Sequence, residues 1–302
     1  MMPAGNIREQ TMTTEKIKFA KEKETMLMTL SGRALQSQWK EPILRDPWAE
    51  EAMRHIDYDI SQQYKGIGSW SMWKDIGSTI IATRAATFDQ LTQQYLAEHP
   101  NAVGLHVGCG MDSRAFRVNP PASVEWFDVD YPDVIELRRQ LFPERPAYHL
   151  VGAQLDDLRW LDEVPGGRPG LLIAEGVLHY LNEADVKALL NAVVAHFPSG
   201  QMIFDICNSF IVKRAGSNVG GTGATYRWGL DDPQAIKRLE PKLELVRASF
   251  GLYNTTEEVD AFVAALEKIS RSEYRGHYQQ VKASGDYVPE GWTPRFEKYF
   301  SL

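Results

Sequence analysis

The chain has 302 residues, of which 43% are hydrophobic and 24% charged, so it is long enough to bury a core of its own. A formal net charge of −7 and a pI near 5.6 argue against a broad nucleic-acid surface, because such surfaces neutralise phosphates with Lys and Arg. The longest apolar stretches fall short of the roughly 20 residues that cross a bilayer, and no basic-then-apolar signal segment opens the chain. We therefore expect a cytoplasmic protein with a small-molecule or peptide-like partner, no nucleic acid and no membrane; the sequence leaves its oligomeric state open.

The first third of the chain predicts helices. From Glu24 to Met53 apolar residues recur irregularly and are interrupted at Gly32 and Pro42, which predicts two short helices and a turn. An aromatic, glycine-rich loop follows at Tyr64 to Trp73. The apolar spacing from Ile76 to Leu96 then predicts one long helix.

After this helix, strand-like runs alternate with segments of helical spacing. The strands are expected at Val103–Val107, Val124–Asp130, Tyr148–Gly152, Gly170–Ala174, Gln201–Ile206 and Leu243–Ser249. Helical segments between the first five include Val134–Leu141 and Glu183–Ala195. The alternation predicts a doubly wound α/β fold, with a mainly parallel sheet covered on both faces. Ligands should then bind at the carboxyl ends of the strands.

Residues Ser209 to Gly229 interrupt this rhythm with glycines among Ser, Thr and Asn. The segment is interpreted as a mobile insertion after the fifth strand, which either covers a substrate or simply connects two elements. Helical spacing returns from Glu257 to Ser270.

One domain is expected after a flexible N-terminus at residues 1–22. It would span residues 23–302: a helical cap and substrate region (23–100), a cofactor-binding core (101–208), and the insertion with the last part of the sheet (209–302).

The strongest local signal is the run Val107-Gly108-Cys109-Gly110-Met111-Asp112-Ser113-Arg114, which lies between a strand and a helical stretch. Glycines let the backbone turn tightly and let a ligand approach where a Cβ would collide. A dinucleotide fingerprint needs a third glycine or alanine at the position of Ser113, so that pattern is only half met. A tight turn without a ligand would also favour glycine here.

Acidic residues end the second and fourth strands. Asp130, 20 residues after Gly110, is placed to accept hydrogen bonds from both ribose hydroxyls of a nucleotide. Its alternative role is an N-cap on the helix that begins near Pro132. Asp128 is either a second polar contact or a structural residue. Glu175 could pair with an ammonium group in the central crevice or cap a helix.

Arg84 lies in the long helix ahead of the first strand. An arginine there can bind a carboxylate through a bidentate fork, or it can be an ordinary residue of the helix surface. The two cysteines, Cys109 and Cys207, lie in strand-like runs, which argues against a disulfide framework. The number and spacing of possible ligands also exclude a zinc site, so we expect no metal.

Four of these motifs together resemble the leucine carboxyl methyltransferase family, most closely its branch of tetracenomycin-type polyketide O-methyltransferases. They are Arg84, Gly108–Arg114, Trp126–Pro132 and Ala174–Leu181. The segments Pro42–Ala49 and Asp57–Ile60 are also similar, so the resemblance covers about residues 24 to 206. It implies a class I, Rossmann-like methyltransferase with a seven-stranded sheet and S-adenosylmethionine as cofactor.

The resemblance also implies roles for individual residues. Arg84 would hold the methionine carboxylate of the cofactor, and the loop Gly108-Cys109-Gly110 would pass close to it. Asp130 would bind the ribose, and Glu175 would face the methionyl ammonium region. Where family members contact adenine with Asp-Leu, this chain has Gln154-Leu155; Gln still offers a carbonyl acceptor but no charge.

Methyl transfer from a sulfonium is an in-line displacement, in which the enzyme mainly aligns nucleophile, methyl group and sulfur. A carboxylate acceptor is ionised at neutral pH and needs no base, whereas a phenol with a pKa of about 10 would gain from one. His179 and Tyr180 are the candidates for acceptor contact or deprotonation, although a lone His after a strand is more often structural. Aromatic residues of the Tyr64 to Trp73 loop, with Tyr226 and Trp228, would suit a flat or apolar acceptor or form the core of a cap.

The resemblance thus implies O-methylation of a carboxylate or hydroxyl on a small, polyketide-like or other secondary-metabolite acceptor. Three alternatives remain at this point. One is methylation of a peptide or protein carboxylate. Another is an NAD-dependent oxidoreductase, which also uses a glycine loop and an acid but gives no role to Arg84 or Glu175. The third is a cofactor-binding protein without turnover.

Overall fold

The computed structural model describes residues 22–56, 70–215, 223–242, 278–280 and 287–289. The chain divides into two compact units, Met1–Gly251 and Leu252–Leu302, which are described separately. In the second unit, β6 (Tyr278–Gln280) and β7 (Tyr287–Pro289) pair antiparallel. The expected domain boundaries stay predictions.

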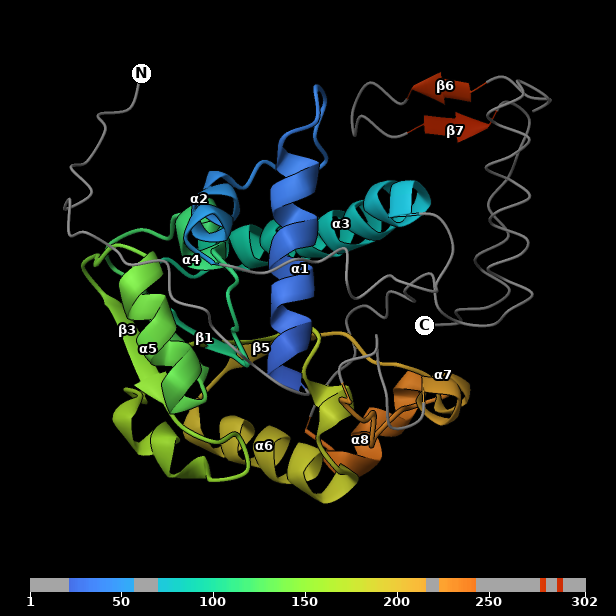
Figure 1. Cartoon of the computed structure of the whole chain (residues 1–302). Coiled ribbons are helices and arrows are strands. Elements are labelled where there is room, and N and C mark those ends of the chain that lie inside the picture. Colours follow the sequence, from blue (N-terminus) through green and yellow to red (C-terminus); the bar gives the residue numbers. More distant parts are fainter. Residues whose placement is uncertain (1–21, 57–69, 216–222, 243–277, 281–286, 290–302) are drawn as a thin grey trace. The chain divides into compact units, whose positions relative to one another are not determined.

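Within the described residues of the first unit, one sheet contains five parallel strands (Figure 1). They are β1 (Val103–Val107), β2 (Glu125–Asp130), β3 (Tyr148–Gly152), β4 (Gly170–Ala174) and β5 (Gly200–Phe204). The order β3-β2-β1-β4-β5, with parallel pairing throughout, confirms the predicted doubly wound α/β fold. The described sheet has five strands where seven were expected, and the predicted strand Leu243–Ser249 lies outside the described residues.

Helices cover this sheet and extend beyond it. They are α1 (Glu22–Ser37), α2 (Pro47–His55), α3 (Trp70–Glu98), α4 (Arg114–Val118), α5 (Pro132–Leu141), α6 (Glu183–His196), α7 (Ser209–Ala215) and α8 (Ile236–Leu239), with the 3-10 turns η2 (Leu158–Glu163), η3 (Leu178–Tyr180) and η4 (Pro233–Ala235). The predicted helices Ile76–Leu96, Val134–Leu141 and Glu183–Ala195 are thereby confirmed. Among the described residues, none of the helices combines the length and apolar character that a bilayer crossing requires.

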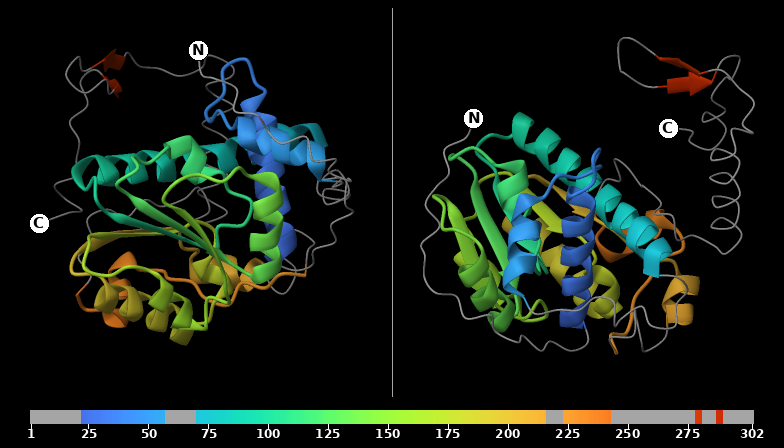
Figure 2. Two further views of the ribbon diagram at one scale, coloured as in Figure 1. Left: turned by 90° about the vertical axis from the view of Figure 1, so that its left-hand side faces the viewer. Right: turned by 45° about the horizontal axis from the view of Figure 1, so that its top comes forward.

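Two apolar clusters lie on the two faces of the sheet, because alternate residues of a strand point to opposite sides. Leu171 and Ile173 of β4 pack with side chains of α3 and α4. Leu172 and Ala174 pack with side chains of α6. Figure 2 shows α3 and α6 on opposite faces of the sheet.

The strand order changes direction between β1 and β4, since β2 and β3 lie on one side of β1 and β4 and β5 on the other. In open α/β sheets, ligands bind beyond the carboxyl ends of the strands at this switch point. The segments that leave β1 and β4 begin at Gly108 and Glu175. The fold therefore brings two of the predicted motifs to the expected binding edge.

The break expected at Gly32 is wrong, because α1 continues through this residue. A Cβ at Gly32 would lie 2.5 Å from Cδ1 of Ile81 on α3, so the glycine allows a close approach of two helices. The helix ends after Ser37 instead, and the turn before α2 contains Pro42 as predicted.

Both described parts of the predicted insertion differ from the irregular loop that the sequence indicated: the first is a helix, and the last contributes to the core. Ser209–Ala215 forms α7, and the N–H of Ser209 donates to Oδ1 of Asp231 at 2.7 Å. Trp228 is 4% exposed and belongs to the α6 side of the core. The predicted aromatic loop is wrong at residues 70–73, whose backbone already belongs to α3. Other predicted segments lie outside the described residues: Asp57–Ile60, residues 64–69, residues 216–222 and Glu257–Ser270.

Candidate active site

The loop after β1 contains two glycines in the left-handed region. The φ angle is 60° at Gly108 and 48° at Gly110, values that other residues rarely adopt. A Cβ at Gly108 would collide with the side chain of Val177, and one at Gly110 would lie 3.0 Å from Cβ of Met26. Cys109 between them is buried, and burial raises the pKa of its thiol well above the usual range. Backbone geometry and packing thus require both glycines, so a ligand is not needed to explain them.

Asp130, at the end of β2, holds this loop in place. Its Oδ2 accepts a hydrogen bond from the N–H of Gly110 and its Oδ1 one from the N–H of Tyr131, both at 2.7 Å. The N-cap of α5 is Tyr131, so the N-cap alternative for Asp130 is wrong. Burial raises the pKa of the Asp130 carboxyl. Each of its oxygens has a second lone pair, which leaves capacity for further hydrogen bonds.

Asp128 is a structural residue. It is fully buried and accepts hydrogen bonds from Nε1 of Trp126 at 2.8 Å, the hydroxyl of Tyr148 at 2.5 Å and Nη2 of Arg138. Nδ1 of His106 lies 3.2 Å from its Oδ1. Burial opposes ionisation of this carboxyl, but Arg138 and His106 outweigh it and lower the pKa of Asp128 to about 2. The alternative of a second ligand contact is therefore not supported.

Gln154 and Leu155 lie in the loop after β3, beside Asp130. The N–H of Ala153 donates to the carbonyl of Asp130 at 2.8 Å, which joins this loop to the end of β2. Gln154 is exposed, whereas Leu155 is partly buried against the α6 side of the core. Contact of these two residues with adenine stays a prediction.

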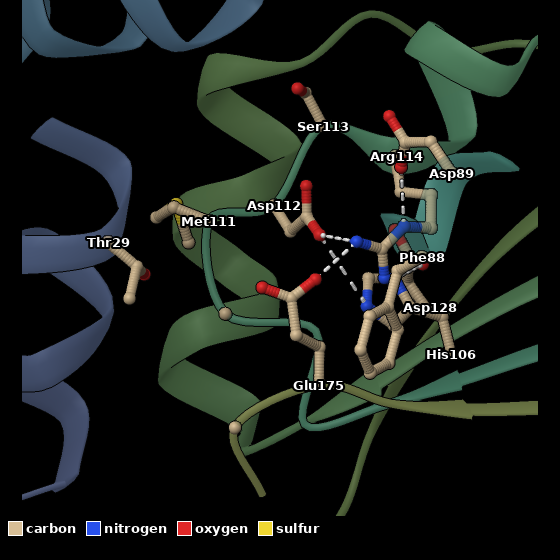
Figure 3. A network of polar contacts seen from close by, with 12 residues as sticks. Thr29, Phe88, Asp89, His106, Met111, Asp112, Ser113, Arg114, Asp128 and Glu175 are labelled. Carbon is tan, nitrogen blue, oxygen red and sulfur yellow. Dashed lines mark hydrogen bonds and ion pairs between the residues drawn. The ribbon is translucent and has the colours of Figure 1, made fainter. Parts of the chain in front are cut away.

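Glu175 follows β4 and contacts two arginines, Arg84 and Arg114. Figure 3 shows its contact with Arg114. Its Oε1 accepts a hydrogen bond from Nε of Arg84 at 2.8 Å, and its Oε2 accepts one from Nη2 of Arg114. Burial alone would raise the pKa of the Glu175 carboxyl, but the two guanidinium groups hold it below its ordinary value. Arg84 and Glu175 are 91 positions apart and are in direct contact, so Arg84 is not an ordinary surface residue. The N-cap of the 3-10 turn that follows is Val177, so Glu175 does not cap it.

Asp205, which follows β5, belongs to the same cluster although the sequence analysis did not select it. Its Oδ1 accepts a hydrogen bond from the N–H of Gly176 at 2.6 Å, and its Oδ2 lies 3.3 Å from Nη1 of Arg84. The signal that could have identified it is the one used for Asp130 and Glu175, namely an acidic residue at the carboxyl end of a parallel strand.

Three aromatic residues, two of them in the η3 turn after β4, lie next to one another. The ring of His179 is 4.3 Å from that of Tyr226 and 4.6 Å from that of Tyr180, measured between centroids. The hydroxyl of Tyr180 lies 3.3 Å from Oγ1 of Thr25 on α1. Trp228, predicted together with Tyr226 for an acceptor pocket, is part of the core instead.

His179 is uncharged in the folded protein at neutral pH. It is 4% exposed, and its Nδ1 has no hydrogen-bond partner among the described residues. Burial lowers the pKa of His179 to about 4, although the nearby carboxylate of Asp205 opposes this shift. A buried nitrogen without a partner is uncommon. The alternative that His179 has a structural role predicts a hydrogen bond to its ring, and Nδ1 makes none among the described residues.

The pKa of His179 predicts acid sensitivity. Because the imidazole has a lower pKa in the folded chain than in the unfolded chain, it contributes stability above pH 6.5 that is lost as the pH falls toward 4. Between pH 7 and pH 4.5 this loss amounts to about 2 to 3 kcal/mol. Urea unfolding at both pH values measures this decrease. In His179→Phe, the free energy of unfolding should fall by about 2 to 3 kcal/mol less than in the wild type. An equal loss in the two proteins would contradict the shift.

Comparisons with known proteins identify the family of this chain. The sequence model of the leucine carboxyl methyltransferase family matches residues 26–194. The tetracenomycin polyketide synthesis O-methyltransferase TcmP of Streptomyces glaucescens is 43% identical over 222 residues, which are 73% of this chain and 79% of that protein. The S-adenosyl-L-methionine-dependent methyltransferase dpfgK of Gibberella zeae is 30% identical over 263 residues, 81% of this chain and 87% of that protein. The solved structure of human N-acetylserotonin methyltransferase with SAM covers 59% of this chain and 55% of its own at 14% identity and a TM-score of 0.38, a likeness too low to bear on function.

The matched span contains Arg84, the glycine loop, Asp130 and Glu175. It argues against the oxidoreductase alternative, as does Ser113, which occupies the third position of the dinucleotide fingerprint. Ser113 is fully buried, and its hydroxyl donates to Oδ1 of Asp46 at 2.6 Å. The chain belongs to the leucine carboxyl methyltransferase family and is an S-adenosylmethionine-dependent methyltransferase.

Proposed function

We propose that this protein transfers a methyl group to a carboxylate or hydroxyl oxygen of a small, polyketide-like acceptor. The observation that carries the proposal is the 43% identity to an O-methyltransferase of polyketide synthesis across 79% of that relative's length. The aromatic group of His179, Tyr180 and Tyr226 supports a flat acceptor, since aromatic side chains favour planar apolar ligands.

The charged groups at the sheet edge fit the cofactor. When bound, S-adenosylmethionine supplies a methyl group on a positively charged sulfur. Asp130 would accept from the ribose hydroxyls through the remaining lone pairs of its carboxylate, and Gln154 would accept from adenine. Arg84, whose side chain is 27% exposed, would hold the methionine carboxylate. Glu175 would hold the methionyl amino group.

The residues on the acceptor side orient an oxygen nucleophile. Neutral His179 would accept a hydrogen bond, and then the proton, from an acceptor hydroxyl at Nδ1. Burial raises the pKa of Tyr180, so its hydroxyl stays protonated. Its single O–H donates to Oγ1 of Thr25 at 3.3 Å and would turn from Thr25 to donate to the acceptor. A carboxylate acceptor is already ionised and needs only this orientation.

The test is methyl transfer from a labelled cofactor to a matched pair of aromatic acceptors, one a phenol and the other a carboxylic acid. We expect transfer to at least one of them. If the phenol is the acceptor, His179→Phe should lower its kcat/KM by about 100-fold, the usual contribution of a general base. If the carboxylic acid is the acceptor, the same variant should change its kcat/KM much less.

A peptide that ends in a free carboxylate serves as the competing acceptor. Methylation of that peptide, with no transfer to either aromatic compound, would contradict the proposal. It would favour the alternative of a peptide or protein substrate.

A further inference from the structure

Arg114, the first residue of α4, connects carboxylates from three different segments of the chain (Figure 3). It is fully buried, and its Nε donates to Oδ1 of Asp89 on α3 at 2.8 Å. Its Nη2 lies 3.1 Å from Oδ2 of Asp112 and also donates to Oε2 of Glu175. Figure 3 shows Asp112 and Glu175 converging on this one nitrogen, with the ring of Phe88 beside the guanidinium group.

The two cations on Glu175 differ in their surroundings. Arg84 is partly exposed and also contacts Asp205. Arg114 has no exposed surface and is held by Asp89 and Asp112. If Arg84 binds the cofactor carboxylate, Arg114 remains as the second cation in contact with Glu175.

We propose that Arg114 is a positioning residue for cofactor binding, which keeps the Glu175 carboxylate ionised and directed at the amino group of S-adenosylmethionine. The inference rests on the proposed contact between Glu175 and that amino group. Asp89 anchors Arg114 to α3, the helix that also carries Arg84, so the two cations on Glu175 are held by one element.

Charge balance at Glu175 explains why Arg114 is needed. Among the described residues, the charged groups around this carboxyl are Arg84 from α3, Arg114 from α4 and Asp112 from the glycine loop. Asp205, after β5, shares Arg84 with Glu175 and is unchanged in every variant compared below. Burial and Asp112 favour the protonated acid, and the two arginines overcome both. Without Arg114, one cation opposes burial and Asp112, so the pKa of Glu175 should rise. A protonated Glu175 no longer attracts an ammonium group.

Arg117, on the same helix, offers a matched control. It is also buried, with Nε 2.7 Å from Oδ2 of Asp89 and Nη1 2.6 Å from Oδ1 of Asp112. Its third carboxylate partner is Asp46 rather than Glu175. Arg117→Gln therefore removes a comparable buried cation without removing a contact to Glu175.

The experiment is calorimetric titration of the full chain with S-adenosylhomocysteine at pH 8, 7 and 6. For Arg114→Gln we expect the affinity to fall at least about fivefold from pH 8 to pH 6. The wild type and Arg117→Gln should change less than about twofold, and Arg114→Lys, which keeps a cation, should restore the flat profile. Any contribution of Asp130 to the profile is common to all four proteins. The same pH profile for Arg114→Gln and Arg117→Gln would overturn the inference.

Glu175→Gln separates the proposed contact between Glu175 and the cofactor amino group from the proposed role of Arg114. Unchanged affinity in Glu175→Gln at pH 8 would show that the proposed contact with the amino group is wrong. Weaker binding in Glu175→Gln, combined with an Arg114→Gln profile that follows Arg117→Gln, would overturn only the role of Arg114.

If Arg114→Gln does not fold, NMR titration of the Glu175 carboxyl carbon in the wild type decides, with Glu175→Gln identifying the resonance. A pKa below the ordinary range supports the inference. A pKa at or above that range overturns it.

Discussion

Arg138→Met should lower the free energy of unfolding by about 3 to 5 kcal/mol, because it leaves a buried carboxylate without its main cation. Arg138 is fully buried and donates to Oδ2 of Asp128 and to the hydroxyl of Tyr148. It also donates to the carbonyls of Gly110 and Asp112, at 2.7 and 2.8 Å. Urea unfolding at pH 7 measures the loss.

Arg139→Met is the matched control, since Arg139 is adjacent in α5 but exposed. Its change should stay within about 0.5 kcal/mol. Replacing both charges in Asp128→Leu/Arg138→Met should recover part of the loss, because apolar pairs can substitute for buried ion pairs. Equal losses in Arg138→Met and Arg139→Met would show that the Asp128–Arg138 pair does not stabilise the fold.

Asp130→Ala should weaken the binding of S-adenosylhomocysteine by about 1 to 3 kcal/mol, or roughly 5-fold to 150-fold. The substitution removes the proposed acceptor for the ribose hydroxyls and releases the N–H of Gly110. Calorimetric titration at pH 8 measures the effect, and circular dichroism confirms that the variant is folded.

Asp133→Ala serves as the comparison, because Asp133 lies in the first turn of α5, the helix after Asp130, but pairs with Lys23 at the surface. Its affinity should equal that of the wild type. Asp130→Asn, which keeps one acceptor oxygen, should fall between Asp130→Ala and the wild type. Unaltered affinity in Asp130→Ala would remove the ribose assignment.

Buried ion pairs also explain the role of one motif outside the glycine loop. Asp46, from the family-like segment Pro42–Ala49, is the N-cap of α2 and accepts from Nε of Arg33 at 3.1 Å and from Nη1 of Arg117 at 2.9 Å. Nη2 of Arg33 donates in turn to the carbonyl of Met111 at 2.8 Å. The N-terminal helices are therefore tied to the loop after β1 by ion pairs and hydrogen bonds.

The alternation of strands and helices could be predicted from the sequence because apolar periodicity is a local property. Each of the five strands in the described sheet lies within two residues of its predicted bounds. The sequence predicted a helix break at Gly32 because glycine has a low intrinsic helix propensity. In the structure, the close packing of Gly32 against Ile81 outweighs that propensity, and the helix continues. The family and its cofactor also followed from the sequence, because the motifs that carry them are short and contiguous.

The partners of the charged residues followed only from the tertiary structure. Sequence motifs placed Arg84 and Glu175 in one site, but not the direct ion pair between them or the second arginine, Arg114. Asp205 was not selected, and Asp128 could not be separated from Asp130 by position alone. By itself, the sequence determined the alternation of strands and helices, the family and the end of the sheet that carries the candidate site. Only the tertiary structure decided which carboxylate faces which cation, because strand order and burial bring together side chains that are distant along the chain.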